Sequence, residues 1–123
     1  MSTIKANTLL HSDGSTTTQP SIPALDKRMA HSFITFKGTD TVAIEQSYNV
    51  TSLVDVGTGI YRVNFSANPS TTLYTGLVSS DQNINNTPWY EKNGQLIGSY
   101  EVRMHTGSGY YDTRRVFSVI FST

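Results

Sequence analysis

The chain contains no cysteine, which excludes disulfide bonds and thiolate metal sites. It has no apolar run near the roughly 20 residues that a membrane-spanning helix needs, and its start lacks a basic region followed by an apolar stretch. These absences predict a soluble chain without membrane insertion or a secretion signal. The sequence does not indicate whether the protein works in an oxidising or a reducing compartment, because a chain without cysteine suits both.

An excess of charge is also lacking, since nine lysines and arginines balance nine acidic residues. The basic residues are scattered apart from the pair Arg114-Arg115, so no nucleic-acid-binding surface is predicted. Apolar residues are scarce as well, at 37% of a 123-residue chain against about 45–50% in typical domains. A single domain with so thin a core favours stabilisation by partner subunits, and therefore a homo-oligomer.

The first 30 residues differ in composition from the rest of the chain. STIKANTLL, residues 2–10, mixes polar and apolar residues in a way that suits a short edge strand. Residues 11–23 are rich in Ser, Thr, Gly and Pro and predict an extended arm, while ALDKRMA, residues 24–30, is long enough for one or two helical turns only. We therefore expect an N-terminal strand, arm and short helix in residues 1–30, followed by a folded domain in residues 31–123.

From His31 onward the hydrophobic pattern has the period of two that is typical of strands. About eight short strands separated by turns predict an all-β fold, a single antiparallel β-sandwich or a small barrel. HSFITFKG, residues 31–38, has large side chains on both of its faces, which predicts that Ile34 or Phe36 contacts a neighbouring subunit. NVTSLVDVGTGIYRVNFS, residues 49–66, predicts a hairpin with a bulge near Ser52 and positive φ angles at Gly57 and Gly59.

No motif in the sequence indicates catalysis or a cofactor. The histidines His11, His31 and His105 are isolated, without the spacing of a metal site, and no nucleophile elbow occurs. We therefore expect no cofactor, no metal and no enzyme activity. A glycan-cleaving pair of carboxylates stays open as a remote alternative, because any two of the nine acids could be brought 5 to 10 Å apart by the fold.

Two polar segments carry aromatic pairs. NTPWYEKNG holds Trp89 and Tyr90, and GSGYYDTRR holds Tyr110 and Tyr111 together with Arg114. Exposed Tyr, Trp and Arg are typical of binding surfaces, because they bring a large contact area at little cost in side-chain entropy. The same residues could instead cover the thin core or fill a subunit interface. The sequence thus predicts either a loop surface for a host glycan or receptor, or a structural lid.

Residues 27–66, KRMAHSFITFKGTDTVAIEQSYNVTSLVDVGTGIYRVNFS, resemble a module of tail-fibre and other minor virion proteins of tailed bacteriophages, marine phages and cyanophages in particular. The first residues, MSTIKANTL, are also similar to the short starts of such proteins. The family's usual Trp is replaced here by Phe33 at a displaced position, and the chain after Phe65 follows no pattern of the family. The matching residues are Ala30, Phe36, Gly38, Thr39, Val42, Ala43, Ile44, Tyr48, Asn49, Val50, Gly57, Thr58, Gly59, Val63, Asn64 and Phe65.

The resemblance implies a virion protein with a structural and binding role, commonly trimeric and without enzyme activity. It favours a tail-fibre or receptor-binding module, in which residues 1–23 attach the chain to other virion proteins. The alternative is a capsid decoration or head-fibre protein, in which the same arm would hold the chain to the shell.

Overall fold

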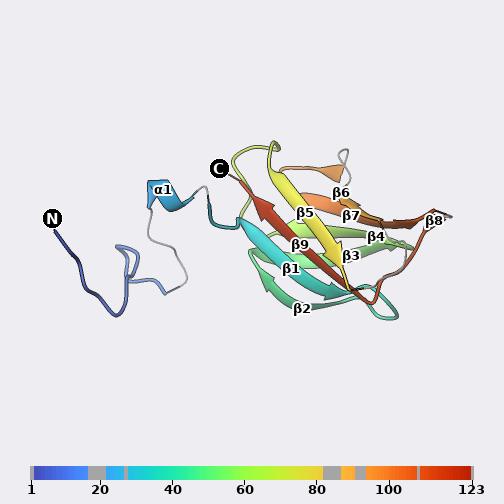
Figure 1. Cartoon of the computed structure of the whole chain (residues 1–123), viewed down its shortest axis with the longest axis horizontal. Coiled ribbons are helices and arrows are strands. Elements are labelled where there is room, and N and C mark those ends of the chain that lie inside the picture. Colours follow the sequence, from blue (N-terminus) through green and yellow to red (C-terminus); the bar gives the residue numbers. More distant parts are fainter. Residues whose placement is uncertain are drawn as a thin grey trace.

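The computed structural model describes residues 2–16, 22–26, 28–81, 87–90, 94–107 and 109–122. From residue 32 onward the chain forms two antiparallel sheets packed face to face (Figure 1). The predicted all-β sandwich is therefore confirmed. An N-terminal segment extends from one end of this sandwich, beyond the start of the first strand (Figure 1).

The first sheet, sheet A, has the strand order β2-β1-β9-β5. The second, sheet B, has the order β3-β4-β7-β6, with β8 pairing with β7. The strands of sheet A are β1 (Ser32–Lys37), β2 (Ala43–Tyr48), β5 (Thr75–Ser80) and β9 (Arg115–Phe121). Those of sheet B are β3 (Val50–Gly57), β4 (Ile60–Phe65), β6 (Thr87–Tyr90), β7 (Ser99–Thr106) and β8 (Gly109–Tyr110).

The core lies between the sheets and is built from alternate residues of the central strands. Because successive side chains of a strand point to opposite faces, every second residue of β1, β4, β7 and β9 is buried. Ile34 and Phe36 belong to this set, at 1% and 0% exposed. The prediction that either of them contacts a neighbouring subunit is therefore wrong for this fold, because both are enclosed by their own chain. The other buried apolar residues are Tyr61, Val63, Phe65, Tyr74, Tyr100, Val102, Met104, Val116 and Ile120.

The predicted hairpin of residues 49–66 is formed by β3 and β4. Thr58 and Gly59 make its two-residue turn, and the register shifts between Val50 and Ser52, where the bulge was expected. Gly59 has a φ angle of 68°, and a side chain there would meet the backbone nitrogen of Tyr111 at 2.6 Å. The prediction of positive φ is wrong for Gly57, which is not among the positive-φ glycines of the described chain.

Asn49 connects the two sheets where the chain leaves β2 and enters β3. Its φ angle is 56°, in the left-handed region that Asn tolerates better than most residues. The side-chain amide donates to the carbonyl oxygens of His31 and Ala67, both over 3.0 Å, and its oxygen accepts from the Ala67 amide over 2.7 Å. One residue thereby holds the corner between β1, β2 and the chain that follows β4.

The N-terminal segment has little structure of its own. Residues 2–16 contain no strand, so the edge strand expected at residues 2–10 is not formed in the structure described. The expected short helix is present as α1 (Pro23–Asp26), a single turn. No described helix has the length and apolar character needed to cross a bilayer.

Candidate binding surfaces

Both predicted aromatic segments lie beside one strand, β7. Trp89 and Tyr90 belong to β6 and pair with Arg103 and Val102 of β7 through their backbones. Tyr110 belongs to β8 and pairs with His105 of the same strand. The prediction that Trp89, Tyr90 and Tyr110 lie in loops is therefore wrong for their backbones. The side chains of Trp89 and Tyr90 lie outside the described part of the structure.

Tyr110 is held by contacts with two side chains of β7. Arg103 donates from Nη1 to the Tyr110 hydroxyl over 3.1 Å, and its guanidinium carbon lies 5.8 Å from the centre of the ring. His105 meets the same ring edge to face, with 5.5 Å between the ring centres. Tyr110 nevertheless stays 43% exposed. The ring is thus fixed in position while part of its surface remains open to a ligand.

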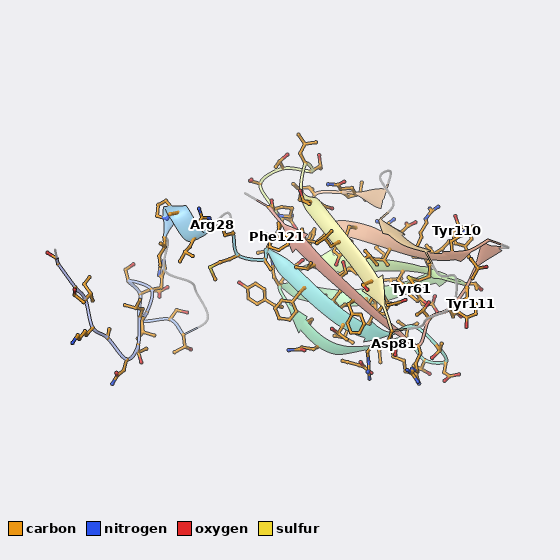
Figure 2. The ribbon with its side chains drawn as sticks, viewed as in Figure 1. Arg28, Tyr61, Asp81, Tyr110, Tyr111 and Phe121 are labelled. Carbon is orange, nitrogen blue, oxygen red and sulfur yellow. The ribbon has the colours of Figure 1, made fainter. Side chains whose placement is uncertain are left out.

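Figure 2 shows Tyr110 and Tyr111 at the end of the sandwich opposite Arg28 and the N-terminal segment. Tyr111 is 36% exposed, and its backbone amide donates to the Met104 carbonyl oxygen over 3.2 Å. We call Arg103, His105, Tyr110 and Tyr111 the tip surface. The two tyrosines are therefore exposed at the end of the sandwich away from the arm, which fits the binding-surface alternative of the two that the sequence left open.

The guanidinium of Arg103 is anchored by Glu101, a nearly buried carboxylate. Arg103 Nη2 lies 2.7 Å from one Glu101 oxygen, and Arg62 Nη2 lies 2.7 Å from the other. Glu101 is 6% exposed, and a side chain at Gly94 would meet its Cβ at 2.5 Å. Two arginines thus share one acid, and one of them, Arg103, also contacts the Tyr110 ring.

Arg114 does not belong to the tip surface. Its guanidinium donates to Asp81 over 2.8 and 3.0 Å, at the point where β5 ends and β9 begins. The hydrogen bonds from Arg114, followed by its charge and by the Arg115 amide, hold the pKa of Asp81 below its usual value. The sequence reasoning missed Arg103 and His105, which the alternation in SYEVRMHT places on the same side of β7 as Glu101.

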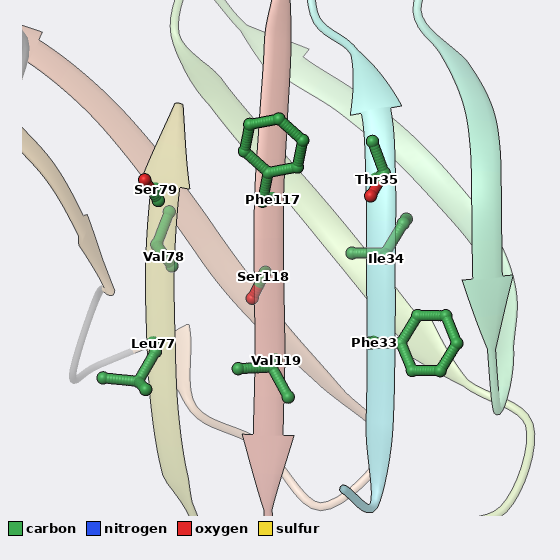
Figure 3. Close-up of a pocket in the computed structure, with 9 residues that line it drawn as sticks. All are labelled: Phe33, Ile34, Thr35, Leu77, Val78, Ser79, Phe117, Ser118 and Val119. Atoms are coloured by element: carbon green, nitrogen blue, oxygen red, sulfur yellow. The ribbon is translucent and has the colours of Figure 1, made fainter. Parts of the chain in front are cut away.

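A second surface is an apolar groove of about 280 Å³ on the outer side of sheet A (Figure 3). Its walls are the side chains that alternate with the core residues of β1, β9 and β5. Leu77 and Phe117 are the most open of its apolar side chains, at 60% and 37% exposed. We call this feature the outer groove; its outward residues are Phe33, Thr35, Leu77, Ser79, Phe117 and Val119.

The strand register aligns the apolar residues of the outer groove in one row. Tyr48, Phe33, Val119 and Leu77 are successive partners across β2, β1, β9 and β5. Tyr48 and Phe33 stack, with 5.8 Å between ring centres. Towards the far end of the strands the same face becomes charged, where Arg115 donates to Glu45 over 2.6 Å. The outer face of sheet A is thus apolar along this row and charged at its other end.

Within the described ranges, no three His, Asp or Glu side chains converge in a way that could hold a metal ion. Three of the described carboxylates, those of Glu45, Asp81 and Glu101, are engaged by arginines. Comparison of the chain with protein-family models, curated proteins and solved structures finds no match.

Proposed function

We propose that this chain is a bacteriophage virion structural protein, a trimeric tail-fibre or receptor-binding module. Its N-terminal arm serves assembly with other virion proteins, and its tip surface binds the host. The resemblance of residues 27–66 to phage tail-fibre and minor virion proteins supports the virion assignment. The β-sandwich is compatible with it, because sandwiches commonly serve as display scaffolds for binding residues.

The observation that carries the proposal is the placement of the two surfaces. The arm leaves one end of the sandwich, and Tyr110 and Tyr111 lie exposed at the other (Figure 2). An adhesion module needs this polarity, because one end must attach to the particle while the other meets the cell. A decoration protein needs the attachment end alone, so an exposed pair of tyrosines beside an anchored arginine favours adhesion.

The chemistry of the tip surface fits a glycan or a protein receptor. Flat aromatic faces stack on sugar rings or on apolar side chains, and an arginine beside them offers donors to hydroxyl or carboxylate oxygens. Arg103 is fixed by Glu101 over 2.7 Å, so it loses little entropy when a ligand binds. Glycan cleavage is kept only as the remote alternative, because the arginine-paired acids Glu45, Asp81 and Glu101 are poor candidates for a general acid.

The test is adsorption of the purified protein to host cells. We expect Tyr110→Ala with Tyr111→Ala to weaken adsorption about 30-fold or more, which corresponds to a loss of about 2 kcal/mol at a binding hot spot. Val54→Ala with Val56→Ala is the matched control, because both valines are exposed, at 46% and 52%, on β3. Unchanged adsorption of a folded double tyrosine variant would contradict the adhesion role and favour the capsid decoration or head-fibre alternative.

A further inference from the structure

The outer groove and the arm each leave apolar side chains in solvent within a single chain. In the arm these are Ile4 and Leu10, at 88% and 49% exposed, and in the groove they include Leu77 and Phe117. We propose that residues 2–10 of one copy lie across the outer groove of a second copy. The groove is then the receiving half of an arm-exchange interface, and the arm is its ligand.

The alternation within residues 2–10 supports this assignment. In an extended segment Ile4, Ala6 and Leu10 share one face with two small hydroxyl residues, while the other face carries Lys5, Asn7 and a single large apolar residue, Leu9. The first face therefore holds most of the apolar side chains, and it is the face that we place against the groove. Ile4 and Leu10 would be roughly 20 Å apart. The row from Tyr48 to Leu77 spans four strands, roughly 14 Å, so the segment is long enough to cross it.

The size of the face argues against other occupants. A fully buried aromatic side chain contributes about 150–250 Å², so the exposed parts of Phe117 and Tyr48, at 37% and 48%, offer roughly 60–120 Å² each. Adding Leu77 gives a few hundred Å², well below the roughly 800 Å² per partner of a stable interface. Two bare faces of sheet A would therefore make a weak dimer, whereas an added arm enlarges the contact.

A small-molecule ligand fits the groove less well. Its volume of about 280 Å³ lies just under the roughly 300–1,000 Å³ of ligand pockets. Its outward polar groups are the hydroxyls of Thr35 and Ser79, without a charged side chain among the lining residues. A groove of this kind accepts a few apolar side chains from an extended peptide.

The arm points away from the sheet of its own chain, which favours exchange between copies. Figure 1 shows the N-terminal segment leaving the sandwich beyond the start of β1. Residue 31 precedes that strand directly, so the arm emerges next to the end of the groove that Phe33 lines. Contact between unlike surfaces of successive copies is heterologous, and it closes into a ring when the rotation between copies allows it. Such a ring accommodates the proposed trimer.

The absence of cysteine from the sequence permits a direct test by disulfide trapping in the full chain. Leu10→Cys chains carrying a mass tag are mixed with untagged Leu77→Cys chains, allowed to exchange subunits, and oxidised with oxidised glutathione. We expect a mixed cross-linked species of one tagged and one untagged chain. Val54→Cys, an exposed apolar position on sheet B, replaces Leu77→Cys in the control and should give at least tenfold less of that species.

Three results would overturn the proposal: no mixed species, equal cross-linking to Val54→Cys, or a cross-link within one chain in the double variant Leu10→Cys with Leu77→Cys. The last result would mean that the arm covers its own sheet.

A second readout uses the concentration at which the oligomer dissociates. Leu10→Asp should raise it about tenfold or more, while Leu9→Asp, on the opposite face of the extended segment, should raise it much less. Equal effects of the two variants would contradict the facing assigned to the arm.

The interface stands apart from the proposed function, because arm exchange does not require the tip surface to bind a host. Loss of adsorption in the tyrosine variant with intact cross-linking would leave this inference standing. Intact adsorption with no cross-linking would overturn the inference and leave adhesion standing.

Discussion

The hydroxyl of Tyr61 donates a hydrogen bond to the carbonyl oxygen of Gly38 over 2.8 Å, from a ring that is completely buried. Tyr61 belongs to sheet B and Gly38 follows β1 of sheet A, so this bond joins the two layers. A side chain at position 38 would lie 2.6 Å from that hydroxyl and 2.5 Å from the carbonyl oxygen of Thr113. The need for this close approach explains why Gly stands at position 38.

We expect Gly38→Ala to lower the free energy of unfolding by about 1–3 kcal/mol, because a methyl group would force the Thr113 backbone and the Tyr61 ring apart. Urea denaturation measures the change. Gly57→Ala is the control, since nothing lies within 4 Å of a side chain built there. If both variants were equally stable, the sandwich would have to relax at the Gly38 corner without cost.

Stability should fall in alkaline solution through the buried tyrosines. Burial, then the charge of Asp112 and the hydrogen bond to it, raises the pKa of Tyr61, and burial raises the pKa of Tyr100. A phenol whose pKa is raised by folding stabilises the native state fully below the unfolded pKa of about 10, and this contribution is lost as the pH rises toward the folded pKa.

The free energy of unfolding should therefore decline above about pH 10. Tyr61→Phe should decline less steeply over the same range, because one titrating phenol is gone. Urea titrations between pH 8 and pH 11 test this difference in slope. Parallel curves for the two proteins would show that Tyr61 titrates alike in both states.

The hairpin of residues 49–66 and the alternation of β4 were predictable because they depend on neighbours in sequence. Which face of β1 points inward was not predictable, since Phe33 and Ile34 are both large. The facing is set by distant strands: β9 beside it in the sheet, and β4, whose Tyr61 packs against Phe36. Strand β6 was missed for a similar reason. Pro88 and polar neighbours argue against a strand, but an edge strand tolerates proline, and its partner β7 lies further along the chain. The tip surface depends instead on the pairing of β7 with β8, which places Tyr110 opposite His105.

Glu101 should be the most sensitive charged residue of sheet B. Glu101→Gln keeps the shape of the side chain but leaves Arg62 and Arg103, which are 29% and 28% exposed, without their shared counter-charge. We expect a loss of about 1–3 kcal/mol in unfolding free energy, less than for a fully buried pair because both arginines reach solvent. Urea denaturation measures it, and Glu45→Gln at the exposed Arg115 pair should cause little change. A neutral effect of Glu101→Gln would mean that Arg103 holds its position without the acid.

Deletion of residues 1–23 should separate folding from assembly. Within this segment, the described residues are almost all exposed and contribute nothing to the core between the sheets, so the shortened chain should unfold in urea within about 0.5 kcal/mol of the full chain measured as a monomer. Light scattering should find three chains per particle for the full protein and one for the shortened protein, because the outer groove loses its occupant. The shortened protein should also fail to incorporate into virions. If it remained trimeric, assembly would depend on a surface of the sandwich itself; if it still entered the particle as a monomer, the arm would serve neither attachment nor exchange.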